Sequence, residues 1–275
     1  MQVAELNIYP VKSTRGFSVQ RAGVQPWGLA DDRRWMVVDV EGSLITARVQ
    51  PALLGVRATP LGEGRLRLEG PHAAPLEVDA TSREGLVPVR VWRSHLSATP
   101  AGPGADAWFG KLLDRDVRLV WLDDPTRRPT NPDYSRPGDR VSFADGYPIL
   151  LTSAASLRQL NDWIVEEALT RGEEPAGPLP MRRFRPSVVV EHDEPFAEDH
   201  WRRLRIGGIE FRVPKPCDRC VLTTIDPDTL AKGKEPIRTL SRHRRWDGKV
   251  WFGTNLIPDG TGTISVGDPV EVLPD

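Results

Sequence analysis

The sequence predicts a mostly-β protein of the α+β class with a few helices. Short segments that alternate apolar and polar residues recur along the chain, separated by turn residues. Helical periodicity is clear in only a few places, and helices do not alternate with strands as they do in parallel α/β folds. At 275 residues the chain is long for one domain. We therefore expect one large domain or two modest ones.

Strands dominate the first half. A Glu-Gly-Ser turn at 41–43, between the strands expected at 34–40 and 44–47, is typical of a hairpin. A single helix is predicted at 105–114, where Trp108 and Leu112 share a face. The expected strands lie at 3–11, 17–26, 34–40, 44–47, 55–60, 65–70, 76–80 and 87–92.

Residues 123–146 contain four prolines, many charges and little periodicity. This composition predicts a loop or linker. Loops of this length within a compact chain are usually functional or mobile.

The clearest helix spans 152–172. Leu157, Leu160, Ile164 and Ala168 form its apolar stripe, Thr152 or Ser153 caps its start, and Gly172 ends it. A shorter helix is expected at 235–240. Further strands are expected at 147–151, 187–192, 202–207, 209–213, 220–226, 249–253, 262–266 and 269–273.

Composition excludes several classes of protein. The formal net charge of −1 gives no global attraction to nucleic acid or to anionic membranes. No apolar stretch approaches the ~18 residues of a membrane span, and the first residues do not resemble a signal peptide. Two cysteines make no disulfide framework, so a reducing cytoplasm is the expected location.

Both cysteines lie in one Cys-x-x-Cys stretch, Cys217 and Cys220. A zinc site needs four ligands, and only scattered histidines such as His192 and His200 could complete it. A redox dithiol normally opens a helix, whereas the following β-branched run predicts a strand. From the Cys-x-x-Cys spacing alone, the favoured interpretation is two small buried residues at the start of a strand.

The stretch 219–229, RCVLTTIDPDT, resembles the signature of the MOSC family, named after the C-terminal domain of molybdenum cofactor sulfurases. Within it, the chain is similar to the mitochondrial amidoxime-reducing components and their bacterial relatives. The resemblance implies an N-terminal β-barrel-like domain at 1–122 and a β-barrel MOSC domain at 123–275. Further matching blocks follow in the family's order at 9–13, 31–39, 44–51, 145–157, 183–190 and 252–273.

The resemblance implies that Cys220 is the catalytic thiolate ligand of molybdenum and that Cys217 is a bystander. A soft thiolate suits a metal already bound by a sulfur-rich dithiolene. The same resemblance assigns contacts with the molybdopterin cofactor to Lys12, Ser13, Arg33 and Arg185. Ser153, at a helix start where free N–H groups bind anions, is a further expected contact.

Each of these residues also has a plain structural interpretation. Lys12 could be a solvated strand-end charge, Arg33 a surface residue beside Asp31 and Asp32, and Arg185 the partner of a carboxylate. Ser153 is a helix cap in either case. Arg48 lies in a matching block, where a structural ion pair and a cofactor contact are both open. The nine tryptophans are expected to pack in the core and loops.

Two positions depart from the family pattern. Leu230 follows Asp-Pro-Asp-Thr where the family usually has glycine, which predicts a different turn. Ser187 replaces an asparagine after Phe-Arg-Pro, which predicts a changed hydrogen bond near the cofactor.

The implied function is a molybdenum cofactor-dependent reductase that converts the N–OH group of a small compound to N–H and water. Asp226 and Asp228 are conceivable proton relays, although Asp-Pro-Asp-Thr is typical of a turn. The chain has neither cysteines for an iron–sulfur cluster nor a dinucleotide fingerprint. Electrons are expected from a separate ferredoxin- or cytochrome-type protein with its reductase. The activity is expected not to depend on pyridoxal phosphate. The alternative is a molybdenum cofactor carrier or sulfur-transfer protein, because the matching motifs indicate that the cofactor is bound but not which reaction follows.

Overall fold

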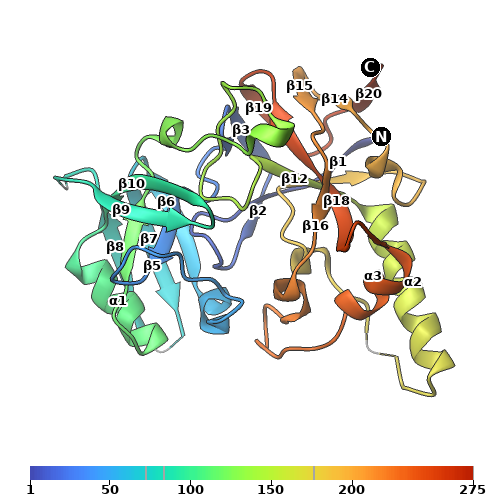
Figure 1. Ribbon diagram of the computed structural model, residues 1–275, viewed down its shortest axis with the longest axis horizontal. Helices are drawn as coiled ribbons and strands as arrows, with labels where there is room; N and C mark the ends of the chain where they lie inside the picture. The colour runs from blue at the N-terminus through green and yellow to red at the C-terminus, as the bar shows by residue number, and fades with distance from the viewer. Residues whose placement is uncertain (72, 83, 176, 275) are drawn as a thin grey trace. The chain divides into compact units, whose positions relative to one another are not determined.

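The computed structural model describes residues 1–71, 73–82, 84–175 and 177–274 (Figure 1). The chain forms two compact units. Unit 1 consists of residues 1–7, 18–25 and 149–275, and unit 2 consists of residues 8–17 and 26–148. These units interleave along the chain, whereas the expected domains at 1–122 and 123–275 follow chain order.

Unit 1 is built around one long sheet. The strands of this unit are β1 (Gln2–Ile8), β3 (Arg21–Gln25), β12 (Ile149–Ser153), β13 (Val188–Glu191), β14 (Arg203–Ile206), β15 (Ile209–Arg212), β16 (Pro216–Asp218), β17 (Arg245–Trp246), β18 (Lys249–Pro258), β19 (Gly262–Ser265) and β20 (Val270–Leu273). Of these, β3 and β19 pair with each other outside the long sheet. Strand β2 (Phe17–Val19) lies at the boundary of the units. The helices are α2 (Ala154–Thr170) and α3 (Ile237–His243), with 3-10 turns η4 (Met181–Arg183), η5 (Ala197–Asp199) and η6 (Val221–Thr224).

The sheet of unit 1 is barrel-like. Its strand order is β2-β1-β13-β12-β18-β15-β14-β20, with β16 and β17 also paired to β18. Strand β1 also meets the residues just before β20, because Gln2 bridges Pro269 and the Val3 N–H donates to the Asp268 oxygen at 3.0 Å. This contact gives the sheet of unit 1 a barrel-like form and confirms the expected β-rich class, with β1 contributed from outside residues 123–275.

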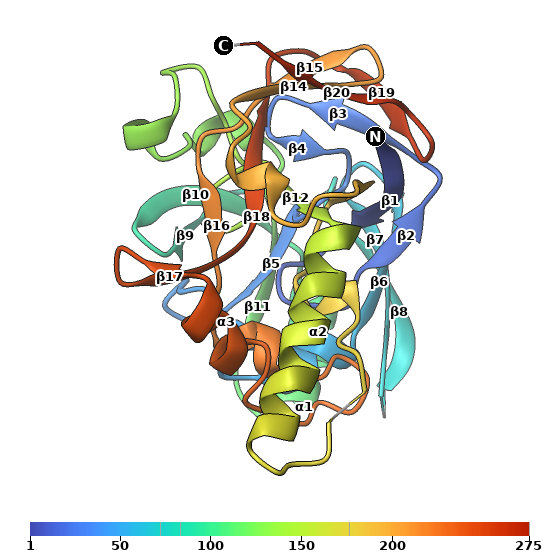
Figure 2. The same cartoon turned by 90° about the vertical axis from the view of Figure 1, so that its right-hand side faces the viewer.

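One parallel pair interrupts the antiparallel pattern of unit 1. Strands β12 and β13 run parallel, and α2 lies in the connection between them, as a parallel pair requires. The expected apolar stripe of α2 is confirmed, since Leu160, Ile164 and Ala168 are buried. Figure 2 shows α2 beside α3, with which it packs.

The core of unit 1 lies between these helices and the sheet. The rings of Phe184 and Phe252 stack with centroids 4.0 Å apart. Burying one such side chain contributes roughly 1.5–3 kcal/mol. The other buried members of this cluster are Leu160, Ile164, Leu179, Met181, Val189 and Leu240.

Unit 2 contains two sheets, of order β5-β11-β10-β9 and β6-β7-β8. Its elements are β4 (Gly28–Leu29), β5 (Trp35–Val38), η1 (Pro51–Gly55), β6 (Arg57–Gly62), β7 (Arg65–Gly70), β8 (Ala73–Asp79), β9 (Val87–Val91), β10 (Ser94–Pro100), α1 (Pro103–Leu113), β11 (Arg118–Trp121), η2 (Pro125–Arg127) and η3 (Pro132–Tyr134). The expected hairpin after β5 is reduced to one bridge, Val38 to Leu44. Strands β10 and β11 were not predicted.

The proline-rich segment 123–146 is a loop, as predicted, and belongs to unit 2. Buried Arg128 holds it in place by donating to the main-chain oxygens of Ser142, Ala144 (2.6 Å) and Asp145 (3.0 Å). Burial lowers the pKa of Arg128 to about 10, with Asp145 opposing the shift. No helix in the described residues is long and apolar enough to cross a membrane.

Candidate functional site

The two cysteines differ in their surroundings. Both are free thiols at intermediate exposure. Cys217 lies in β16, and its Sγ accepts a hydrogen bond from Arg219 Nη1 at 3.1 Å. Cys220 is the N-cap residue of η6, and no hydrogen bond engages its Sγ within the described residues. Cys220 is therefore the thiol that remains available.

The prediction of a strand at 220–226 is wrong. Val221–Thr224 forms the 3-10 turn η6, in which the hydroxyl groups of Thr223 and Thr224 donate to the Cys220 and Val221 oxygens at 3.0 and 2.8 Å. Such local bonds compete with pairing in a sheet. The argument against a redox dithiol that rested on a strand therefore no longer applies.

Arginines hold the Cys220 loop against the segment that carries Arg185. Arg219 Nη2 donates to the Phe184 oxygen at 2.6 Å, and Arg183 Nη2 donates to Asp226 Oδ2 at 2.9 Å. Arg182 pairs with Asp228. These contacts bring together the loops of two predicted site residues, Cys220 and Arg185.

The Asp-Pro-Asp-Thr stretch forms a turn. Asp226 Oδ1 accepts the N–H groups of Thr229 and Asp228, each at 2.9 Å. The main-chain bond from Thr229 is the largest cause that lowers the pKa of Asp226. Because its oxygen accepts main-chain N–H groups and its pKa is lowered, Asp226 is better explained as a residue that stabilises the turn than as a proton relay.

Leu230 corrects another expectation. Its φ of 61° lies in the left-handed region that glycine adopts readily. Leu230 thus adopts a glycine-type conformation, so the expected different turn is not supported by its backbone.

Ser153 occupies the predicted N-cap of α2, but its side chain makes no capping bond. The residue is fully buried, and its Oγ has no hydrogen-bond partner in the described residues. A buried hydroxyl without a partner is costly and calls for an explanation. Ser187 is also fully buried, and its N–H donates to the Leu150 oxygen at 2.9 Å.

Three predicted cofactor residues have unusual backbones. Ser13, Arg33 and Arg185 have φ values of 70°, 49° and 56°. Non-glycine residues in this region store strain, which is often found at functional sites.

Lys12 is not a solvated charge. Its side chain is 6% exposed, and Nζ donates to the Phe143 oxygen at 2.7 Å and to Asp145 Oδ1 at 2.5 Å. Burial lowers the pKa of Lys12 to about 8, Asp145 opposes this shift, and Arg128 and Arg33 add to it. Lys12 and Arg33 therefore belong to one cationic cluster in unit 2.

Arg33 is equally well fixed. It pairs with the fully buried Asp32, and its guanidinium carbon lies 4.2 Å from the ring centre of Tyr9. Asp32 also accepts the Tyr9 N–H at 2.8 Å. The interpretation of Arg33 as a surface residue is wrong.

The sequence interpretation missed two residues beside Lys12. Asp145 accepts Trp92 Nε1 at 3.2 Å and lies 3.7 Å from Arg48, which is centred 4.5 Å over the Trp92 ring. Loss of hydration raises the pKa of Asp145, but the charge and hydrogen bond of Lys12, the charge of Arg48 and the hydrogen bond from Trp92 together lower it strongly. Asp145 begins the matching block 145–157, which was the available signal.

These residues fit a molybdenum–pterin group. A soft ligand is available at Cys220, and cations with structured surroundings are available at Lys12, Arg33 and Arg185. Ser153 adds one buried hydroxyl without a partner in the described residues. Lys12, Ser13 and Arg33 belong to unit 2, and Ser153, Arg185 and Cys220 to unit 1. Their convergence on one cofactor stays a prediction.

The described residues contain no group of three or more His, Cys, Asp and Glu side chains that could hold a metal ion. His192 Nδ1 instead accepts the Glu194 N–H at 2.9 Å. The zinc alternative thus finds no ligand cluster in the described ranges.

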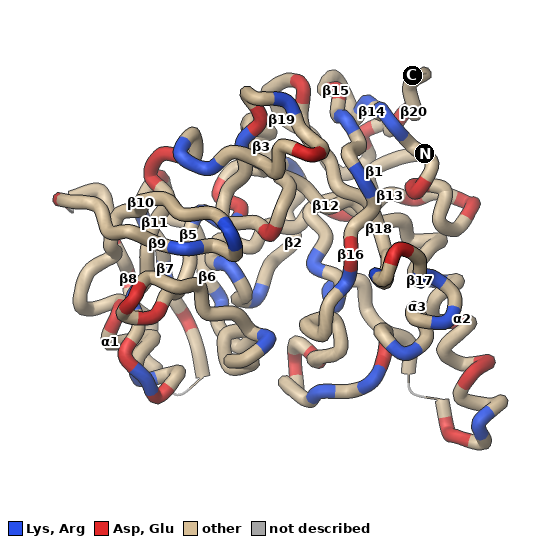
Figure 3. The backbone as a smooth tube through the Cα atoms, in the orientation of Figure 1, with Lys and Arg blue, Asp and Glu red and all other residues tan. Residues whose placement is uncertain are grey.

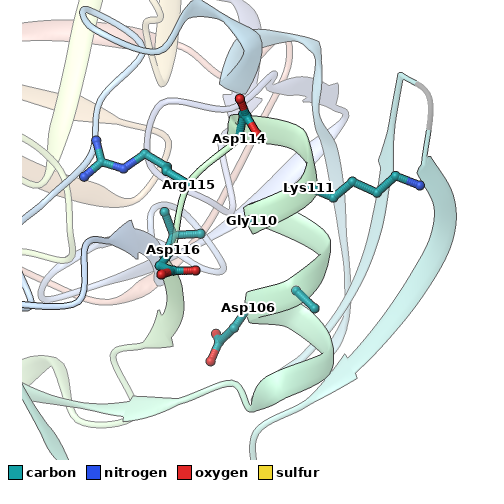
Figure 4. A pocket seen from close by; sticks show the side chains of 8 residues that line it. Asp106, Gly110, Lys111, Asp114, Arg115 and Asp116 are labelled. Atoms are coloured by element: carbon teal, nitrogen blue, oxygen red, sulfur yellow. The ribbon is translucent and has the colours of Figure 1, made fainter.

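An open depression of about 540 Å³ lies along α1, lined by residues of 106–117 (Figure 4). Lys111 and Arg115 point to opposite sides there, and Asp106 Oδ1 accepts the Leu119 N–H at 2.9 Å. None of the predicted site residues lines this depression.

Comparison with known proteins places the chain. The MOSC N-terminal beta barrel domain matches residues 1–116, and the MOSC domain matches residues 138–271. Mitochondrial amidoxime-reducing component 1 of Homo sapiens is 33% identical over 98% of this chain and 82% of its own length. Mitochondrial amidoxime reducing component 2 of Rattus norvegicus is 34% identical over 99% and 83%. Molybdenum cofactor sulfurase of Solanum lycopersicum is 28% identical over 99% of this chain and 36% of its own. The chain belongs to the MOSC-domain family that includes the mitochondrial amidoxime-reducing components.

Proposed function

We propose that the chain is a molybdenum cofactor-dependent reductase that converts the N–OH group of small compounds to N–H and water. The observation that carries this proposal is the 33% identity with an amidoxime-reducing component over 98% of the chain, across both domains. A match of this extent covers nearly the whole chain and 82% of the relative, rather than one motif.

Cys220 is the proposed metal ligand. Its thiol has no hydrogen bond in the described residues, whereas the Cys217 thiol accepts one from Arg219. When bound, the cofactor would supply the redox-active metal centre that reduction of an N–OH group requires, and Cys220 would hold it. The protein holds the thiol at the start of η6 through the arginine contacts of its loop.

Lys12, Ser13, Arg33 and Arg185 are the proposed cofactor contacts. A guanidinium presents a planar fork suited to phosphate or to the polar edge of a pterin. The left-handed backbones of Ser13, Arg33 and Arg185 support this role. Ser153 is a further proposed contact through its buried hydroxyl.

A separate protein is the proposed electron source. The sequence has no cysteine beyond Cys217 and Cys220 for a cluster. A ferredoxin- or cytochrome-type donor with its reductase fits this composition. The cytoplasmic location stays a prediction, and two of the relatives named above carry "mitochondrial" in their names.

A cofactor carrier or sulfur-transfer protein is the second candidate. The similarity to a molybdenum cofactor sulfurase over 99% of this chain favours it. A carrier needs the same thiol and the same cofactor contacts, so the site residues do not separate the two functions.

Turnover separates them. The purified protein is first assayed for molybdenum and pterin, then for reduction of an amidoxime with reduced methyl viologen. A reductase turns over with this donor and shows no activity with NAD(P)H alone. A carrier stays inactive with every donor but passes the cofactor to an apo-molybdoenzyme. Transfer without turnover would overturn the reductase proposal.

A further inference from the structure

The segment 231–249 of unit 1 is strongly basic. It contains seven lysines and arginines against Glu235 and Asp247, while the whole chain has a net charge of −1. The segment comprises α3, β17 and the start of β18. Its cations are drawn in blue around α3 and β17 in Figure 3. A local basic surface on a nearly neutral protein attracts acidic partners over a distance of about a Debye length.

Some of these cations are neutralised within unit 1. Arg238 pairs with Glu235 at 2.6 Å, Arg242 with Glu167 at 3.2 Å, and Arg244 with Asp199. Arg245 and Lys249 differ, because both are exposed and neither has an ion pair within the described part of the chain. Neither charge is therefore neutralised by a carboxylate there, and the Lys249 ammonium also lies 5.6 Å from the ring centre of Trp251.

An exposed aromatic side chain lies between these two cations. Trp246 is 39% exposed, and its Cα is paired with that of Lys249, as Arg245 is with Val250. We call Arg245, Trp246 and Lys249 the hairpin surface. In Figure 2 the hairpin formed by β17 and β18 extends away from α2 and α3. Tryptophan and arginine are the residues most enriched among energetically important interface contacts.

The hairpin surface leads to the Cys220 loop through a second tryptophan. The rings of Trp246 and Trp251 stack with centroids 5.5 Å apart, and Trp251 is only 6% exposed. Trp251 is paired with Asp218 in β16, and the Arg219 N–H donates to the Val250 oxygen at 2.7 Å. Cys220 is the next residue. The exposed ring is thus joined to the proposed metal ligand by one stacked ring and one strand pairing.

We propose that the hairpin surface binds a small acidic one-electron donor protein. This inference rests on the proposed reductase function and names the partner of the same site. Reduction of N–OH to N–H consumes two electrons and two protons and releases one water molecule. A one-electron donor must therefore bind, transfer and leave twice in each turnover. A small charged surface suits such an exchange, because it speeds encounter without requiring a large permanent interface.

The test measures binding to the cofactor-loaded protein. The probes are a plant-type [2Fe–2S] ferredoxin and a flavodoxin, both acidic, with the basic cytochrome c as a charge-reversed control. We expect at least one acidic probe to bind at 20 mM NaCl. Its affinity should fall at least tenfold at 200 mM NaCl, and at least tenfold for the variant Arg245→Glu/Lys249→Glu. The control variant Lys111→Glu/Arg115→Glu reverses two exposed cations on unit 2 and should bind as the wild type does.

Turnover gives an independent readout. The hairpin variant should keep its activity with reduced methyl viologen and lose at least tenfold with the protein donor. Failure of both acidic probes to bind, or unchanged binding by the hairpin variant, would overturn the inference while viologen turnover left the reductase intact. Absence of viologen turnover in the wild type would instead overturn the reductase proposal. Tighter binding of a 20-nucleotide single-stranded DNA than of either acidic protein would assign the surface to nucleic acid and overturn the inference.

Discussion

Arg219, the residue before Cys220, donates a hydrogen bond of 2.6 Å to the main-chain oxygen of Phe184, the residue before Arg185. The same guanidinium donates to Cys217 Sγ at 3.1 Å. One side chain therefore sets the distance between the loops of the proposed thiolate and of a proposed cofactor cation. It also occupies the thiol that is not proposed as a ligand.

Arg219→Lys should loosen the Cys220 loop. An ammonium lacks the planar fork that reaches both partners, and loss of a charged hydrogen bond costs about 1.5–3 kcal/mol. We expect faster hydrogen exchange in residues 216–224 and a several-fold loss of bound molybdenum. Arg182→Lys alters a more exposed pair and should change neither quantity. Equal effects of the two variants would contradict the positioning role.

Cys220→Ala should abolish a molybdenum–cysteine bond, whereas Cys217→Ala should keep it. The reason is that only the Cys220 thiol lacks a hydrogen bond in the described residues. X-ray absorption at the molybdenum edge measures the metal–sulfur shell directly. Identical spectra of the two variants would favour a dithiol or another ligand.

Arg185→Lys should weaken retention of the cofactor by about tenfold, which corresponds to about 1.4 kcal/mol. The positive charge is kept, but bidentate contact is lost. Pterin released per protein after gel filtration measures the effect, and circular dichroism controls for folding. Undiminished retention would show that Arg185 acts only as a structural ion-pair partner.

Leu230→Gly should stabilise the protein by up to about 1 kcal/mol, because glycine adopts a φ of 61° without the steric cost of a Cβ atom. Chemical denaturation measures the free energy of unfolding. Leu230→Ala is the matched control, since it also removes the side chain but keeps the Cβ atom. Equal stabilities of the Gly and Ala variants would show that the backbone is not strained.

Glu198→Gln should stabilise the protein at pH 8 and change little at pH 4. Glu198 is fully buried, its oxygens accept the Ser156 hydroxyl at 2.8 and 2.9 Å, and burial raises its pKa. A carboxyl group with a raised folded pKa contributes stability below its unfolded pKa and loses it as the pH rises through the folded pKa. Each unit of such a shift is worth about 1.4 kcal/mol.

Thermal unfolding between pH 4 and pH 8 measures the difference. Glu194→Gln, at an exposed position of the same segment, is the control and should follow the wild type. A parallel pH dependence of Glu198→Gln and wild type would contradict the prediction.

Local patterns predicted helices and most strands well. The apolar stripe of α2 and the short helix α3 follow from residues within one or two turns of each other. The segment Val221–Thr224 was mistaken for a strand because β-branched residues favour strands, while the hydroxyl bonds that favour a 3-10 turn depend on backbone geometry.

The candidate site could be predicted in part. Lys12, Arg33, Arg185 and Cys220 lie in stretches whose residue types and order resemble a known family. Asp145 and Trp92 were missed, because residues so far from Lys12 in the sequence carry no sign that they lie beside it, apart from the place of Asp145 at the start of the matching block 145–157.

By itself the sequence determined the β-rich class and the family, since these depend on periodicity and on contiguous motifs, and it singled out Cys220 as the proposed metal ligand. Only the tertiary structure decided which charges compensate each other. Lys12 meets Asp145 and Arg183 meets Asp226 across 133 and 43 positions of the chain. Such pairs form because burial makes an unpaired charge costly, and the partner is whichever group the packed chain brings within reach.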